Sequence, residues 1–261
     1  MNASFFEKFF LSHPSALISL VLVFAFLFLS NFGAFIPVQN QQALSFNLFE
    51  RPQNFFLYLF AHSGVAHLVA NVFLVFFLGW VVEGVVPKKH VYGLFFGVGA
   101  MSFALFNLAS PGTFGVGAIG GSIALTAAAF VLSPKKSIIA LLSVLFLSLL
   151  LMGGYNIIQG IEKQNLQAAQ SKAMADLQLA VESKNAPLSA AKLKEVQAVS
   201  AAIKEKELQA QYSKNISVAN AVHLIAAVLA IVYLFLFCRG QAERSMKELL
   251  GFIQGKHLKP F

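Results

Sequence analysis

The chain has 261 residues, of which 57% are apolar and only 11% are charged, with a formal net charge of +8. Its mean hydropathy of +0.72 excludes an ordinary soluble domain and predicts a protein that crosses a membrane several times. Because nearly all the basic residues flank apolar segments or lie in one polar stretch, the positive charge indicates membrane topology and excludes a nucleic-acid partner.

Six apolar segments are each long enough to cross a hydrocarbon layer of about 30 Å as a helix. We expect these spans at residues 14–35, 54–84, 90–109, 115–132, 137–158 and 216–238. The first apolar run lacks a small-residue cleavage site, so we expect it to remain as a membrane helix rather than to be removed as a signal peptide. The sequence therefore predicts an all-α, polytopic membrane protein.

The basic residues gather in alternate loops. One side of the membrane receives Lys8, Lys88, Lys89, Lys135, Lys136 and the tail residues Arg239, Arg244 and Lys247. The opposite side has only Arg51 in its short loops, including residues 110–113. The positive-inside rule then predicts that both termini are cytoplasmic and that the second span begins at the outer face. We expect an integral multi-pass protein of the cell membrane.

The second span carries three polar side chains, His62, His67 and Asn71, in a stretch apolar enough for lipid. His67 and Asn71 are four residues apart, so a helix places them on one face. Polar groups at membrane depth cost free energy, and two interpretations account for these: hydrogen bonding between neighbouring helices, or a functional site. Gly79 and Glu83 lie further along the same helix.

The fourth span is unusually rich in glycine and alanine, and residues 115–129 contain no aromatic side chain. Small residues let helix backbones approach closely, so we expect this helix to be the buried centre of the bundle. The sixth span carries His223 among small residues. Two histidine-bearing helices beside a glycine-rich one favour a polar cavity that opens to the outer face.

Residues 159–215 change abruptly to a composition rich in Ala, Gln, Lys and Glu. Apolar residues recur there at three- and four-residue steps, and Asn185-Ala186-Pro187 divides the two runs with turn chemistry. We predict an outer helical-hairpin insert rather than a flexible polar loop. The predicted organisation is membrane helices one to five in 1–158, the insert in 159–215, membrane helix six in 216–238 and a basic cytoplasmic tail in 239–261.

Across about residues 14–158 and 216–238, these features resemble the rhomboid family of intramembrane serine proteases. The second span of that family carries H-x4-H-x3-N, then a Leu-Gly pair and an acidic residue. This chain matches that spacing with His62, His67, Asn71, Leu78-Gly79 and Glu83. Where the sixth span of the family has Ala-His followed by two glycines, the chain has Val222-His223 followed by Ala226 and Ala230. The resemblance implies a six-helix rhomboid-like bundle.

The resemblance also implies a serine–histidine dyad. In that family a serine of a G-x-S-G motif, at the start of the fourth span, is activated by the sixth-span histidine, which corresponds to His223 here. His67 and Asn71 then match the side chains that assist the oxyanion hole, together with the backbone at Gly117 and Gly120. His62, Gly79 and Glu83 match positions that hold the structure together.

The chain departs from the family at the nucleophile itself. A gapless alignment of residues 116–120 with the motif places Ile119 at the serine position, between Gly117 and Gly120. Isoleucine can be neither deprotonated nor acylated. Ser122 is the nearest substitute, but one helical turn would carry its hydroxyl about 4.5 Å deeper. This register predicts that Ile119 lies between His67, Asn71 and His223 at a similar depth.

Two functions remain open. Ile119 and the missing sixth-span glycines favour a non-catalytic relative that binds transmembrane segments of other proteins. The retained His62, His67, Asn71 and His223 favour an active intramembrane serine endopeptidase that uses Ser122 and His223. In either case the expected partners are single-span membrane proteins and the lipid bilayer. A transporter is disfavoured because no internal repeat is evident, and no metal or other cofactor is expected.

Overall fold

The structure is a computed structural model that describes residues 9–10, 12–30, 43–183, 186–212 and 216–253. Its described residues are almost entirely helical, and within them the extended backbone pairs only at an isolated antiparallel bridge between Phe46 and Gly115. The chain divides into two compact units, one formed by Met1–Ser148 with Ile216–Phe261 and the other by Leu149–Asn215.

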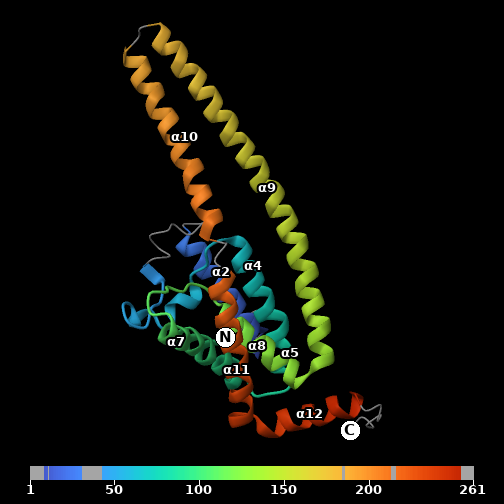
Figure 1. The fold of residues 1–261 in the computed structure, drawn as a ribbon. Helices are drawn as coiled ribbons and strands as arrows, with labels where there is room; N and C mark the ends of the chain where they lie inside the picture. The colour runs from blue at the N-terminus through green and yellow to red at the C-terminus, as the bar shows by residue number, and fades with distance from the viewer. Residues whose placement is uncertain (1–8, 11, 31–42, 184–185, 213–215, 254–261) are drawn as a thin grey trace, which may run out of the picture. The chain divides into compact units, whose positions relative to one another are not determined.

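The first unit contains most of the helices (Figure 1). Two of its long helices contain a π-helical segment, and the second span is preceded by two short 3-10 turns. In chain order the elements are α2 (Pro14–Leu29), η1 (Pro52–Asn54), η2 (Leu57–Phe60), α4 (Val65–Phe73), η3 (Leu74–Leu78), α5 (Gly79–Glu83), α6 (Lys88–Tyr92), η4 (Gly93–Val98), α7 (Gly99–Ala109), α8 (Ile119–Leu132), the first part of α9 (Pro134–Glu182), α11 (Ile216–Phe237) and α12 (Arg239–Ile253).

Among the residues that the structure describes, three helices are long and apolar enough to cross a membrane, namely Val65–Glu83, Lys88–Ala109 and Pro134–Leu151. The pair formed by α11 and α12 also meets this test, although it is bent by 110° at the break between its two helices. The apolar helices α2 and α8 are shorter than a full span. Long helices of this composition indicate an integral membrane protein.

The start predicted for the second span, residue 54, is wrong. Residues 52–60 form the 3-10 turns η1 and η2, and the helix begins only at Val65. This segment turns because its aromatic side chains pack inward: Tyr58 lies 5.5 Å from Phe46 and 5.6 Å from Phe103, measured between ring centroids. All three rings are buried, and burying one large apolar side chain stabilises a fold by about 1.5–3 kcal/mol.

The fourth-span helix α8 lies at the centre of the first unit, as its composition predicts. It contacts α5, α7, α11, α12 and both π-helical segments. A Cβ atom on Gly121 would lie only 2.6 Å from the carbonyl oxygen of Phe95, so the close approach of α8 to the third span depends on that glycine. The small residues of α8 thus let several helices gather around it.

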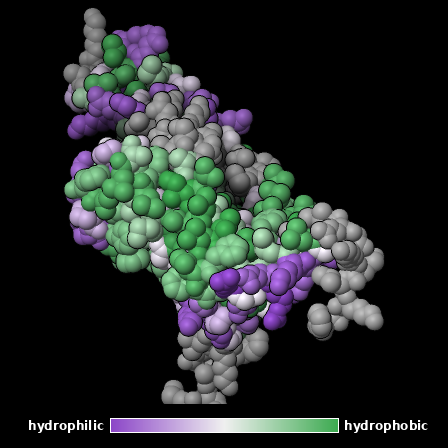
Figure 2. All heavy atoms as spheres, turned by 60° about the horizontal axis from the view of Figure 1, so that its bottom comes forward, coloured by the Kyte–Doolittle hydropathy of each residue, from purple (hydrophilic) through white to green (hydrophobic). Residues whose placement is uncertain are grey.

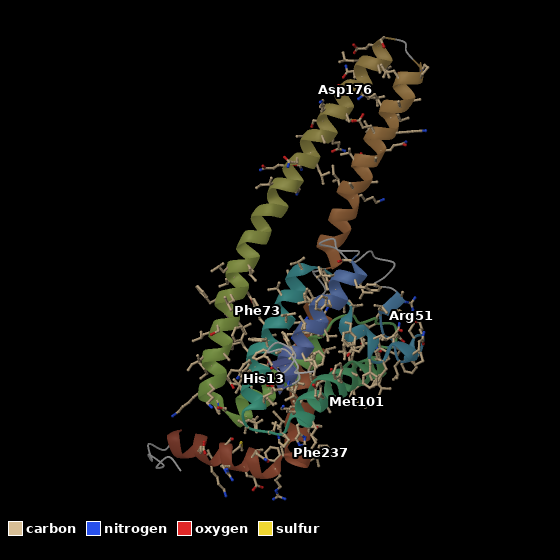
Figure 3. All side chains as sticks on the ribbon, turned by 180° about the vertical axis from the view of Figure 1, so that it is seen from behind. His13, Arg51, Phe73, Met101, Asp176 and Phe237 are labelled. Atoms are coloured by element: carbon tan, nitrogen blue, oxygen red, sulfur yellow. The ribbon has the colours of Figure 1, made fainter. Side chains whose placement is uncertain are left out.

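The second unit consists of the distal part of α9 and of α10 (Ala186–Tyr212). Lys192 Nζ donates to Asp176 Oδ2 at 3.1 Å, and Gln170 Nε2 donates to Ser200 Oγ at 3.2 Å. Because the partner numbers rise on one helix as they fall on the other, the two helices run antiparallel. Asp176, labelled in Figure 3, lies near the end of α9 that leads into α10.

Candidate functional site

Asn71 joins α4 to α8. Its side chain is fully buried, and its Nδ2 donates to the carbonyl oxygen of His67 at 3.0 Å, one turn earlier on α4. The Asn71 Oδ1 accepts a hydrogen bond from Ser122 Oγ at 2.9 Å. Both ends of the amide are therefore used, and buried polar groups satisfied in this way specify how two helices meet.

The Ser122 hydroxyl has a second acceptor in reach, the carbonyl oxygen of Ala118 at 3.0 Å. A hydroxyl carries one proton, so it donates either to Asn71 or to this carbonyl. Ser122 is fully buried, and both neighbours are amide oxygens. An amide oxygen does not take a proton from a serine at neutral pH, so these hydrogen bonds connect Ser122 to α4 and to the turn before α8.

Ile119 is the first residue of α8 and is partly exposed. Our expectation that Ile119 lies at the depth of Asn71 is wrong, because the partner of Asn71 is Ser122, one turn further along α8. Within the chain, Ile119 instead lies between two contact points with α4. The first of these points is Gly117, which contacts His67.

Gly117 is fixed against the ring of His67. Its φ is +107°, a left-handed conformation that favours glycine, and a Cβ atom there would lie 2.5 Å from His67 Cε1. The backbone N–H of Gly117 donates to the carbonyl oxygen of Tyr58 at 2.8 Å. The turn that leads into α8 is therefore clamped between the 3-10 turn η2 and the second-span histidine.

The His67 ring also has a hydroxyl neighbour, since its Nδ1 lies 3.2 Å from Ser63 Oγ. Sequence reasoning missed both Ser63 and Tyr58. A signal for Ser63 was present, because it precedes His67 by four residues, but it falls in the turn before α4 rather than on the helix. Tyr58 carried no comparable signal, because its role depends on how η2 folds against α7, where its hydroxyl donates to the Gly99 carbonyl at 2.8 Å.

His62 precedes α4 and is fully buried beside His67, with 5.2 Å between the ring centroids. Its Nδ1 lies 3.2 Å from the carbonyl oxygen of Phe60. Since a carbonyl only accepts, Nδ1 carries the proton and Nε2 is left as an acceptor. Within the described residues this buried Nε2 has no hydrogen-bond partner.

His223 lies on α11, which packs against α8 and on which the small residues Ala226 and Ala230 are buried. Its Nε2 is buried and has no hydrogen-bond partner among the residues that the structure describes. Ser122 and His223 are thus not hydrogen bonded to each other. Two histidines, from the turn before α4 and from α11, each present a buried nitrogen able to bond a polar group.

The C-terminal end of α5 has a structural role. Glu83 Oε2 lies 3.2 Å from His13 Nδ1, and Glu83 Oε1 accepts a hydrogen bond from the backbone N–H of Ser15 in the first turn of α2. A carboxylate at this position complements the positive end of the helix dipole. A Cβ atom on Gly79 would lie 2.7 Å from Ser15 Cβ, so Gly79 lets α2 approach closely. His13 is labelled in Figure 3.

Comparison with known proteins gives one match. Residues 50–177 match the family model of the Rhomboid domain, and this segment includes α4 and α8 with His62, His67, Asn71, Gly117 and Ser122, whereas His223 lies outside it. No curated protein and no solved structure matches the chain. The match covers the second-span residues quoted for the resemblance, and it supports the rhomboid family for this chain.

Proposed function

We propose that this protein binds the transmembrane segments of single-span membrane proteins in an outward-facing intramembrane cavity, without cleaving them. The observation that carries the proposal is the hydrogen bond from Ser122 to Asn71. In this bond the Ser122 hydroxyl, the nearest substitute for a serine nucleophile, donates to the amide oxygen of Asn71. Ile119, which aligns with the serine of the family motif, is the first residue of α8. A serine needs a base in hydrogen-bond reach before it can attack a carbonyl.

The proposed arrangement has six spans and cytoplasmic termini in the cell membrane. The spans are α2, the helix from α4 to α5, the helix from α6 to α7, α8, the first part of α9, and α11. Basic residues at the starts of α6, α9 and α12 support this orientation by the positive-inside rule. It places His62 and His67 at the outer end of the bundle.

The imidazole nitrogens that lack a hydrogen-bond partner among the described residues suit a bound helix. A transmembrane segment that unwinds in a membrane exposes backbone N–H groups, each of which costs several kcal/mol unless it finds a partner. His62 Nε2 is an acceptor of the required kind, and His223 Nε2 is a second buried nitrogen. The surface of α9 that faces lipid is apolar, with Ile139, Phe146 and Leu149 each more than half exposed. A client in the lipid can therefore pass along this apolar surface of α9 to enter the cavity.

The proposal is tested by site-specific photo-crosslinking in membranes. A benzophenone amino acid at Ile119 is expected to capture a single-span client, because this position lies between the contacts of α8 with His67 and Asn71. The matched control carries the same group at Leu236, which is 70% exposed on α11 and contacts lipid. Equal capture at both positions would show that the client meets only the outer surface of the protein.

Cleavage by Ser122 and His223 is the second candidate function. It is favoured by the buried Nε2 of His223, a potential base whose hydrogen-bonding capacity is not used within the described residues. For this reaction Ser122 would have to leave Asn71 and move toward α11. A cleavage product that disappears in both Ser122→Ala and His223→Ala would establish this function in place of the first.

A further inference from the structure

The tail helix α12 is built into the first unit and lies across its end. It is bent by 110° from α11, and Figure 1 shows it running crosswise below the end of that helix. Ser245 Oγ donates to the carbonyl oxygen of Leu132, the last residue of α8, at 2.7 Å, and Ala242 is fully buried. Because α11 is a membrane span in our arrangement, a helix at this angle runs near the plane of the bilayer surface.

A stripe of exposed apolar side chains follows α12. Met246 and Leu250, one turn apart, are 42% and 51% exposed. At the end of α11, Leu236 and Phe237 are also exposed. Phe237 is labelled in Figure 3, at the point where α11 gives way to α12. An amphipathic helix with such a stripe is suited to lie in a membrane interface.

Basic side chains from three elements converge at the same end. His90 Nδ1 lies 3.2 Å from Tyr233 Oη, which holds the start of α6, with Lys88 and Lys89, beside the last turns of α11. The bond from Ser245 to Leu132 holds α12 beside the end of α8, and α9 begins two residues later with Lys135 and Lys136 in its first turn. Figure 2, with this end turned forward, shows hydrophilic residues beside the apolar surface.

The charges on α12 itself add to this set. Arg244 and Lys247 are exposed, whereas Arg239 is paired with Glu243 through a bond of 2.6 Å from its Nε. The exposed Glu248 also lies on α12, but the basic residues at this end outnumber Glu243 and Glu248. A surface that combines exposed apolar side chains with net positive charge matches a phospholipid leaflet that carries negative headgroups. A zwitterionic leaflet would satisfy the apolar stripe and leave the cations without counter-charges.

We propose that α12, together with the lysines at the starts of α6 and α9, forms a binding surface for anionic phospholipid. Met246 and Leu250 enter the interface, and Arg244 and Lys247 contact the headgroup phosphates. This surface lies at the opposite end of α8 from its first turn, so the inference does not depend on whether the protein binds or cleaves a client.

The test uses the full-length protein in detergent, with a polarity-sensitive fluorophore on Met246→Cys and with Cys238 replaced by serine. The protein is titrated with phosphatidylglycerol or with phosphatidylcholine in mixed micelles. We expect a blue shift at lower concentrations of phosphatidylglycerol. Arg244→Gln and Lys247→Gln are each expected to weaken the apparent affinity about fivefold, because one basic residue near an anionic surface contributes about 1 kcal/mol. Arg244→Lys should keep the response, and added salt should weaken it.

The matched controls are Lys163→Gln and Lys194→Gln, which remove exposed lysines from α9 and α10 in the second unit. They are expected to leave the titration unchanged. An equal response to the two lipids, or an unchanged response in both α12 variants, would overturn the proposal. A shift that depends on protein concentration rather than on lipid would assign the stripe to contact between copies of the chain and would overturn it as well.

Discussion

Ser122 donates a hydrogen bond to the side-chain oxygen of Asn71, 2.9 Å away, and this bond crosses from α8 to α4. Ser122 is thereby part of the network that packs these helices together. Both side chains are fully buried. The bond therefore gives Ser122 and Asn71 a structural role that is independent of any reaction.

Ser122→Ala is expected to destabilise the protein by about 1–2 kcal/mol, because Asn71 Oδ1 loses its donor while buried. Thermal unfolding of the purified protein in detergent measures this. Ser143→Ala is the matched control, since the Ser143 hydroxyl donates to the Ile139 carbonyl of its own helix, at 3.1 Å. Equal stability losses in the two variants would show that the bond between the helices contributes nothing specific.

Ile119→Ser is expected to gain reactivity toward a serine-directed fluorophosphonate probe, and wild-type protein is expected to show none. The new hydroxyl would lie at the first residue of α8, and His223 is the base that the family resemblance supplies on the sixth span. Ile119→Ala serves as the control for loss of the isoleucine alone. Labelling of wild type that vanishes in Ser122→Ala would contradict this prediction.

Gly117→Ala is expected to cost about 1–3 kcal/mol and to reduce client capture, because a methyl group would meet the His67 ring and a non-glycine residue would be held at positive φ. The same unfolding and crosslinking measurements apply. Gly112→Ala is the control, since a Cβ atom there meets nothing within 4 Å. If both variants behave like wild type, the contact between Gly117 and His67 does not position the turn.

The sequence pattern alone was sufficient to predict the shared face of His67 and Asn71 and the central position of α8. Spacing alone placed His67 and Asn71 on one helical face, and composition alone placed α8 at the centre of the bundle, because both follow from local helix geometry and residue size. It was not sufficient for the start of the second span. There the aromatic side chains of residues 52–60, apolar enough for a helix, fold into a cluster with Phe46 and Phe103.

The partner of Asn71 could not be predicted in the same way. The register along α8 follows from the sequence, but the depth at which α8 meets α4 depends on the turn at Gly117, where contacts with Tyr58 and His67 set the start of the helix. These contacts join residues far apart in the chain. A pattern within one segment carries no information about them.

The segment 159–215 allows a prediction about access to the site. We propose that it restrains the fifth and sixth spans, to which it is fused, and so governs lateral entry of a client. Replacing residues 160–214 with a short Gly/Ser linker should change the rate of client crosslinking from Ile119. An unchanged rate and extent of capture, in protein that unfolds at the wild-type temperature, would show that the insert has no such role.

The most direct test of the central claim is a single reaction that measures capture and cleavage together. The photo-crosslinker replaces Val116, which flanks the site, in a protein whose other residues are wild type. This protein is reconstituted with a labelled single-span client, and the products are identified by mass spectrometry. The account predicts a crosslinked complex that contains the intact client, with no fragment above the level seen with His223→Ala. Accumulation of a client fragment that is abolished by both His223→Ala and Ser122→Ala would contradict it.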